Sequence, residues 1–267
     1  MEYYIDILAG IPVDAVEFDI NQMLGVPEME CGKIIGTGNT AVVYEWGEGR
    51  ALKLFHRGYP EEAVEKEFSN ARAICHMDFA KPQAYELIYR EGRAGIIYDR
   101  VEGQSLLDWV MKTQDVHGCG VYMAGLHKKM LKYTIQNVPN YKEFLERGIK
   151  KAAYVLSRQE EMMERLDKLP DGNTFCHGDF HPGNIFLLDG KTTVIDFMNV
   201  CHGCFLYDVA RTVYLMEYTP VPAEMESKKE FLQLKKSLVT SYLTQMGVSR
   251  ESIQDYLSVI AAARAGE

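Results

Sequence analysis

Residues 177–184, which read HGDFHPGN, constrain the fold of this chain more than any other stretch. Asp179 precedes Asn184 by five positions, and Asp196 follows beyond the turn sequence Asp189-Gly190. That turn sequence predicts two strands joined as a hairpin between Asn184 and Asp196. Phosphoryl transfer from ATP requires a carboxylate that accepts a hydroxyl proton, with amide and carboxylate oxygens that hold Mg²⁺ on the phosphates. Asp179, Asn184 and Asp196 supply these groups in that order.

The spacing H-x-D-x-x-x-x-N matches the catalytic loop of protein kinases, in which a later aspartate binds the metal. The full string resembles the aminoglycoside phosphotransferase and choline kinase superfamily, the small-molecule branch of the protein-kinase-like fold. This resemblance implies an α+β fold with two lobes, a small β-rich N-lobe and a larger helical C-lobe. It implies that Asp179 is the catalytic base or orients the acceptor hydroxyl. Asn184 and Asp196 would be the magnesium ligands.

Several departures separate the chain from protein kinases. Gly178 and His181 stand where those enzymes usually have Arg and Lys, and Met198 replaces the glycine of their metal-binding motif. The segment before Asp208 is short and lacks an Ala-Pro-Glu sequence. A protein kinase is therefore the weaker alternative. A nucleotide-binding pseudokinase or regulatory module is also disfavoured, because the lysine, the base and the metal ligands are all present. The resemblance gives Asp208 a structural role, at the start of the next helix, in bracing the catalytic loop.

Residues 1–102 are expected to form the N-lobe, a nucleotide-binding sheet with one long helix at 61–76. Residues 36–43 fit G-x-G-x-x-G-x-V except that Ala41 replaces the third glycine. Glycines let backbone amides approach the phosphates of ATP without interference from a Cβ atom. A plain hairpin turn is the simpler interpretation, but the segment lies between two strand-like runs and ahead of a lysine-bearing one. The residues expected at the phosphates are Gly36, Gly38, Asn39 and Thr40.

Lys53 is a lone cation in the apolar run 50–55, so it must reach water or pair with an anion. The resemblance makes it the lysine that holds the α- and β-phosphates, paired with a glutamate on the following helix. Glu67 is the predicted partner, because it shares a helical face with apolar residues three before it and four and seven after it. Glu65 points elsewhere on the helix.

Residues 96–103 resemble the strand and hinge that end the N-lobe in these kinases, with the lobe boundary at Glu102-Gly103. Main-chain groups bind adenine there, which directs the carbonyl of Asp99 and the amide of Val101 toward the base. Residues 103–267 are expected to form the C-lobe, with the catalytic loop, the metal site and a helical acceptor-binding region. Apolar spacing predicts C-lobe helices at 121–136, 141–169, 207–217, 228–246 and 252–263.

Composition limits the other classes of function. The chain has 267 residues and no apolar run long enough to span a bilayer. Six scattered cysteines and an N-terminus without a basic leader predict a cytoplasmic protein with reduced thiols. A formal net charge of -9 disfavours nonspecific nucleic-acid binding. The C-x-x-C sequence at Cys201 and Cys204 leaves a zinc site as an alternative, weakened because a second such pair is missing.

The sequence therefore predicts Mg²⁺-dependent O-phosphotransfer from ATP, with GTP left open, to a small hydroxylated acceptor. An aminoglycoside, an amino alcohol such as choline and a sugar derivative are the candidates. The negative charge would suit a cationic acceptor, although mild acidity also keeps ordinary proteins in solution. Candidate carboxylates for the acceptor pocket are Glu102, Asp108, Asp115, Glu143, Glu160, Glu161, Glu164, Glu217 and Glu224. The oligomeric state is not predicted.

Overall fold

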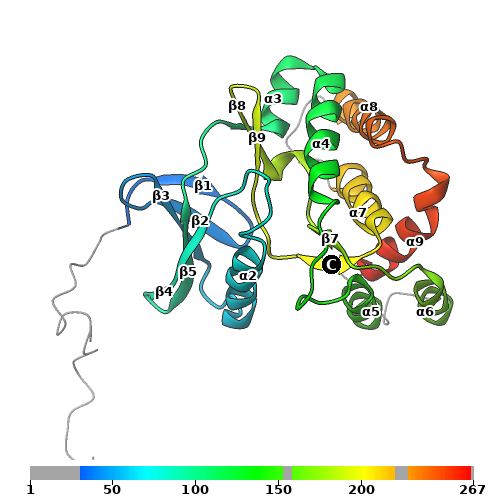
Figure 1. Cartoon of the computed structure of the whole chain (residues 1–267), viewed down its shortest axis with the longest axis horizontal. Helices are drawn as coiled ribbons and strands as arrows, with labels where there is room; N and C mark the ends of the chain where they lie inside the picture. The colour runs from blue at the N-terminus through cyan, green and yellow to red at the C-terminus, as the bar shows by residue number, and fades with distance from the viewer. Residues whose placement is uncertain (1–30, 153–157, 220–227, 266–267) are drawn as a thin grey trace, which may run out of the picture.

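Two lobes of different composition make up the described part of the chain, residues 31–152, 158–219 and 228–265 of a computed structural model. A sheet with one helix forms the smaller lobe, and the other helices form the larger one (Figure 1). The predicted α+β fold with a β-rich N-lobe and a helical C-lobe is confirmed. The predicted N-lobe includes residues 1–30, which lie outside the described residues.

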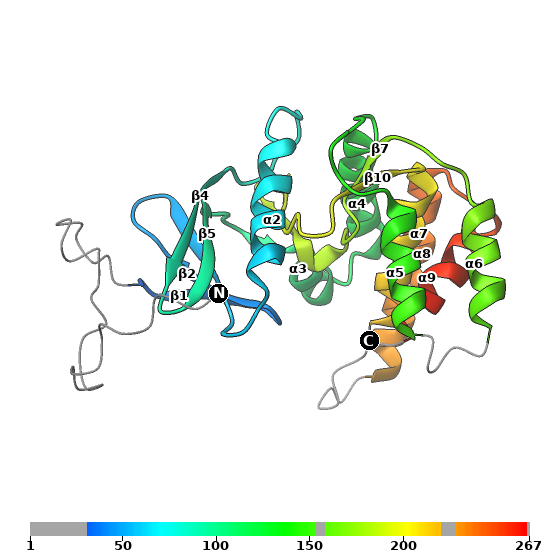
Figure 2. The ribbon, with the colours of Figure 1, turned by 90° about the horizontal axis from the view of Figure 1, so that it is seen from below.

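The N-lobe sheet has five antiparallel strands in the order β1-β2-β3-β5-β4. The strands are β1 (Ile34–Thr37), β2 (Ala41–Glu45), β3 (Arg50–Phe55), β4 (Ala84–Arg90) and β5 (Arg93–Asp99). Helix α2 (Glu61–Ala73) buries Val64 and Ala71, and it lies between the sheet and the C-lobe (Figure 2). Its position lets one helix contact both lobes.

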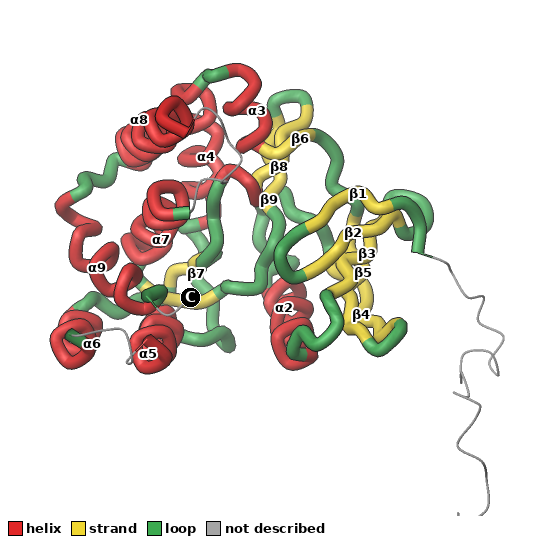
Figure 3. The backbone as a smooth tube through the Cα atoms, turned by 180° about the vertical axis from the view of Figure 1, so that it is seen from behind, coloured by secondary structure: helices red, strands yellow, loops and turns green. Residues whose placement is uncertain are grey.

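Helices α3 to α9 and two small sheets form the C-lobe. The helices are α3 (Leu106–Thr113), α4 (Val116–Met130), α5 (Tyr141–Lys151), α6 (Gln159–Lys168), α7 (Phe205–Tyr218), α8 (Lys228–Met246) and α9 (Gln254–Ala263). One sheet contains β6 (Gln104–Ser105), β8 (Ile185–Leu188) and β9 (Lys191–Val194), and the other pairs β7 (Thr174–Cys176) with β10 (Cys201–Gly203). Helix α7 lies among α4, α8 and α9 (Figure 3) and buries most of its side chains.

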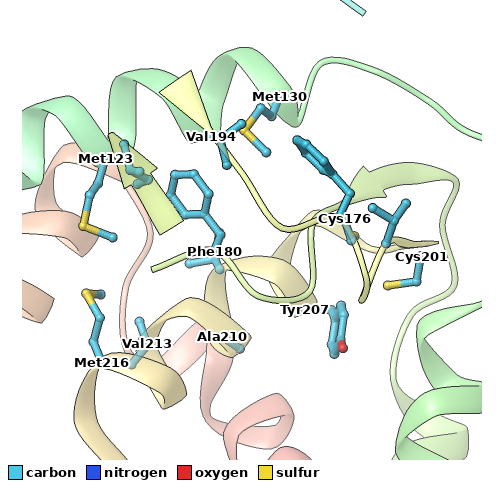
Figure 4. Packing of buried hydrophobic residues seen from close by; sticks show 14 of the residues in the cluster. Met123, Met130, Cys176, Phe180, Val194, Cys201, Tyr207, Ala210, Val213 and Met216 are labelled. Atoms are coloured by element: carbon cyan, nitrogen blue, oxygen red, sulfur yellow. The ribbon is translucent and has the colours of Figure 1, made fainter. Parts of the chain in front are cut away.

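The catalytic-loop segment is anchored in the C-lobe core by Phe180, which is fully buried. Its ring lies among Met123 of α4 and Val213 and Met216 of α7 (Figure 4). Moving a buried phenylalanine side chain into water costs about 2–3 kcal/mol of transfer free energy. The burial of Phe180 therefore restrains the loop.

Some predicted boundaries were wrong. The helix predicted at 121–136 begins at Val116, because the Asp115 carboxylate caps it and accepts a hydrogen bond from the Gly118 amide at 2.8 Å. The helix predicted at 141–169 is two helices, α5 and α6. The β7–β10 pair was not predicted.

Candidate active site

A cavity of about 900 Å³ lies between the lobes, which is the size of small-molecule sites. It is lined by every residue that the sequence places at a nucleotide, a metal or the acceptor hydroxyl. These residues are Gly36, Gly38, Asn39, Thr40, Lys53, Glu67, Asp99, Val101, Asp179, Asn184 and Asp196. The fold thus brings together groups that are far apart in the sequence.

The glycine-rich segment forms the turn between β1 and β2, closed by a hydrogen bond from the Gly38 amide to the Ala41 carbonyl at 2.9 Å. A Cβ atom on Gly36 would meet only the Val43 side chain, at 3.6 Å, and one on Gly38 only the Ala41 carbonyl, at 3.7 Å. These are ordinary contacts, so packing within the protein does not require glycine at either position. Close approach of a ligand in the cavity would require it.

Lys53 of β3 is held by two carboxylates. Its Nζ lies 2.8 Å from Glu67 Oε1 and 3.1 Å from Asp196 Oδ1, and the Tyr98 hydroxyl donates to Glu67 Oε1 at 2.9 Å. Burial alone would lower the pKa of Lys53, but the charges of Glu67 and Asp196 outweigh this effect and raise it. Lys53 therefore stays charged, and its ammonium group is fixed at the cavity wall.

Asp179 and Asn184 are joined within the catalytic loop. The Asn184 Nδ2 group donates to the Asp179 carbonyl at 3.0 Å and to Asp179 Oδ2 at 3.1 Å. Because its nitrogen is used in this way, the amide presents Oδ1 as its remaining polar atom. Burial disfavours the charge of Asp196, yet Lys53 more than offsets this, so the pKa of Asp196 is lowered and the side chain is ionised. An amide oxygen and a carboxylate on one cavity fit the ligand preference of Mg²⁺.

Two histidines flank the base. His177 is fully buried; its Nδ1 accepts from the Asp179 amide at 3.2 Å, and its Nε2 lies 3.1 Å from the Ile195 carbonyl. Burial lowers the pKa of His177, so the ring is neutral and ties Asp179 to the segment before Asp196. His181 Nδ1 accepts from the Gly183 amide at 3.1 Å, and its Nε2 lies 3.8 Å from Asp179 Oδ2.

Asp208 lies in the first turn of α7, as predicted, but its carboxylate does not bond the amides of that helix. It accepts from the amides of His177 at 2.7 Å and Gly178 at 2.8 Å. Gly178 has φ +76°, and a Cβ there would collide with the Asn199 carbonyl. Asp208 therefore braces the catalytic loop directly, in the tight backbone geometry that glycine permits.

Asn70 of α2 was not singled out from the sequence. It is buried, and its Nδ2 donates to the carbonyls of Phe197 at 2.9 Å and Met198 at 3.2 Å. It lies one turn beyond Glu67 on the same helical face, which is the signal that could have identified it. The same face of α2 thus holds both Lys53 and the segment after Asp196.

The hinge residues use some of their polar groups within the N-lobe. The Asp99 carboxylate accepts from the Gln83 amide at 2.9 Å and from the Tyr85 hydroxyl at 2.7 Å. Both oxygens of this carboxylate are therefore hydrogen-bonded within the N-lobe. Adenine binding by the Asp99 carbonyl and the Val101 amide stays a prediction.

The alternative sites find little support in the geometry. Across residues 31–152, 158–219 and 228–265, no group of three or more His, Cys, Asp or Glu side chains is placed to hold a metal ion. Cys201 faces Cys176 across the β7–β10 pair. Of the candidate acceptor carboxylates, Glu102 lines the cavity. Asp108 accepts a hydrogen bond from Ser105 at the start of α3, and Asp115 accepts one from the Gly118 amide at the start of α4. Glu217 forms an ion pair with Arg250. Glu224 lies outside the described residues.

Comparisons with known proteins identify the family and the fold. A model of the phosphotransferase enzyme family matches residues 33–233. An amicoumacin kinase, solved with AMP-PNP, Ca²⁺ and amicoumacin, is 19% identical, with a TM-score of 0.60 over 90% of this chain and 80% of that one. The aminoglycoside phosphotransferase APH(3'')-Id of Streptomyces rimosus, solved with ADP and streptomycin, is 15% identical, with a TM-score of 0.58 over 83% and 90% of the chains. Both have the same fold.

A curated relative is the EKC/KEOPS complex subunit BUD32 of Yarrowia lipolytica, which is 23% identical over 189 residues, 70% of this chain and 68% of that protein. Among the described residues, no helix is both long enough and apolar enough to cross a membrane.

Proposed function

The chain belongs to the phosphotransferase enzyme family, and on this basis we propose that it transfers the γ-phosphoryl group of ATP to a hydroxyl group of a small molecule. The observation that carries the proposal is one cavity in which the Lys53–Glu67–Asp196 ion pairs lie with the joined Asp179 and Asn184. One lobe supplies a fixed cation, and the other supplies a carboxylate base and oxygen ligands.

Each group of cavity residues has a proposed role. Gly36, Gly38, Asn39 and Thr40 would cover the phosphates, Lys53 would neutralise their charge, and Asp99 and Val101 would bind adenine through the main chain. Asn184 and Asp196 would hold Mg²⁺, which when bound neutralises charge on the phosphates. Asp179 would orient the acceptor hydroxyl and accept its proton. Little covalent chemistry is asked of the protein, so its contribution is positioning and fixed charge.

The acceptor is proposed to be a small hydroxylated compound, such as an aminoglycoside, an amino alcohol or a sugar derivative. The names of two structural neighbours support this class, because those proteins bind amicoumacin and streptomycin. Glu102 lines the cavity, and its negative charge would favour a cationic acceptor. A cationic acceptor should show a KM that rises with ionic strength, because the screening length shortens to about 8 Å at physiological salt. A neutral sugar should show little such dependence.

A protein acceptor is the alternative that the sequence leaves open. The segment after Asp196 offers little room for a peptide-binding loop. It forms β10 by Cys201, pairs with β7 and enters α7 at Phe205.

The test is a screen of ATP consumption with aminoglycosides, amino alcohols and sugars, each compared with ATP alone. At least one class should raise the rate of ADP formation well above the rate without acceptor. ADP formation that responds to none of these classes but to added proteins would refute the small-molecule proposal. The inactive control is Asp196→Asn.

A further inference from the structure

A series of buried hydrogen bonds runs from α8 through α4 to the catalytic loop. The Tyr242 hydroxyl of α8 lies 2.6 Å from Nδ1 of His127 on α4, and His127 Nε2 lies 3.0 Å from Oδ2 of Asp208 on α7. These three side chains are at most 1% exposed. Asp208 in turn accepts from the amides of His177 and Gly178, which immediately precede Asp179.

His127 also contacts the loop on the other side of Asp179. Its ring packs against Phe180, with the two ring centroids 4.2 Å apart and the planes inclined by 30°. Phe180 is held in the core between α4 and α7 (Figure 4). Asp208 therefore holds the two residues before Asp179, and burial of its own ring holds Phe180, the residue after Asp179. His127 contacts both Asp208 and Phe180.

The hydrogen-bond partners fix the orientation of the His127 ring. Burial alone would raise the pKa of Asp208, but the hydrogen bond and charge of His127 and the loop amide outweigh burial and lower it. The ionised carboxylate can only accept, so His127 Nε2 carries the proton and donates. The other ring nitrogen, Nδ1, lies 2.6 Å from the Tyr242 hydroxyl, so the two partners together fix the orientation of the ring.

We propose that His127 is a positioning residue for Asp179, and that Tyr242 holds the His127 ring so that Nε2 donates to Asp208. The inference rests on the proposed role of Asp179 as base, but on no particular acceptor. His127 does not line the cavity, so it acts through Asp208 and Phe180. Misplacement of a reacting group by about 1 Å costs about 100-fold in rate, so a small shift of the loop is enough to be measured.

The test compares four variants with the intact chain. His127→Leu removes the donor, whereas His127→Gln places an amide NH₂ near the position of Nε2. Tyr242→Phe removes only the hydroxyl. Tyr256→Phe is the matched control, because this tyrosine of α9 is also buried, and among the described residues its hydroxyl makes no hydrogen bond to His127, Asp208 or the catalytic loop.

Two readouts are measured for each variant. The first is kcat and KM for Mg·ATP with water as the acceptor, followed by release of inorganic phosphate. The second is hydrogen exchange of the His177 and Gly178 amides, which reports on loop geometry without any turnover. Absence of phosphate release from the intact chain would count against the proposed function, while the exchange data would still decide the role of His127.

His127→Leu should speed exchange of both amides and lower kcat by about 10- to 100-fold, with KM for ATP changed by less than about twofold. His127→Gln should restore most of the exchange protection and kcat, Tyr242→Phe should fall between Leu and Gln, and Tyr256→Phe should match the intact chain. The proposal is overturned if His127→Gln is as impaired as His127→Leu, or if Tyr242→Phe leaves both readouts unchanged. Should His127→Leu fail to fold, His127→Gln and Tyr242→Phe decide the question.

Discussion

At the scale of single residues, the candidate site depends on a few charges held where water has limited access. Glu67 is 1% exposed, and it holds Lys53 from one side while Asp196 holds it from the other. Asp196 has φ +69°, which is uncommon for a residue with a side chain. Such backbone strain persists where the surroundings fix it, and it is frequent at functional sites.

Asp196→Asn should lower turnover by at least about 100-fold, because it removes a charge that faces the phosphates and the metal. The substitution conserves shape, so the thermal midpoint should move by only a few degrees, about 4 or less. Steady-state kinetics at saturating Mg²⁺, together with a thermal melt, check both parts. Near-normal turnover in a variant of unchanged midpoint would exclude Asp196 as a metal ligand.

Asp179→Ala should lower kcat by about 10²- to 10⁴-fold while ATP still binds, because a general base acts on the acceptor and not on the nucleotide. Titration of the variant with ATP, followed by fluorescence or calorimetry, measures binding separately from turnover. The separation of roles fails if binding is lost to the same degree as turnover.

At the scale of elements, the sequence predicted the helices and strands that are determined by residues close together in the chain. The β8–β9 hairpin was predicted because Asp189-Gly190 is a turn sequence, and the residues of α8 were predicted because their apolar spacing is regular. The β7–β10 pair escaped prediction because it joins segments that are separated by the whole catalytic hairpin. Neither short strand has a pattern of its own.

The residues of the candidate site also differ in whether the local sequence predicts them. Asp179, Asn184 and Asp196 are recognisable because their spacing is short and fixed by one hairpin. His127 is not, because it contacts the loop from a helix distant in sequence, and nothing in its neighbours indicates the partner. Asn70 also contacts the segment after Asp196 from a distant helix, and its one signal is its place a turn beyond Glu67. A buried histidine in an apolar helix is consistent with plain packing, so only the three-dimensional contacts give His127 its meaning.

The connection between β5 and β6 offers a test at this scale. Gly103 has φ +101°, and a Cβ atom there would lie 2.5 Å from the Leu187 carbonyl. Gly103→Ala should therefore lower the free energy of unfolding by about 1–3 kcal/mol more than Gly92→Ala, because the added methyl group collides with backbone. Gly92 is the matched control, since it also has positive φ but has nothing within 4 Å of the added atom. Urea unfolding measures both, and equal losses would contradict the close approach at Gly103.

At the scale of the whole molecule, the cavity is built from both lobes, so a ligand bound there should stabilise the entire fold. Mg·ATP at about 100 times its Kd should raise the free energy of unfolding by about 2.7 kcal/mol. Lys53→Met should abolish most of this increase at the same ATP concentration, whereas Lys191→Met, at an exposed lysine of β9, should keep it. Thermal melts with and without Mg·ATP provide the measurement, and equal stabilisation of the two variants would remove Lys53 from the nucleotide site.

The central claim is that the γ-phosphoryl group of ATP leaves for the hydroxyl of a small molecule. It is tested most directly by following ³¹P NMR spectra of the protein with Mg·ATP and the pooled aminoglycosides, amino alcohols and sugars. A phosphate monoester signal should grow as the γ-phosphate signal of ATP declines, with one ADP formed per ester, and it should not appear with Asp179→Ala. If ATP is not consumed, or if its phosphate is found only on protein side chains, the claim is contradicted.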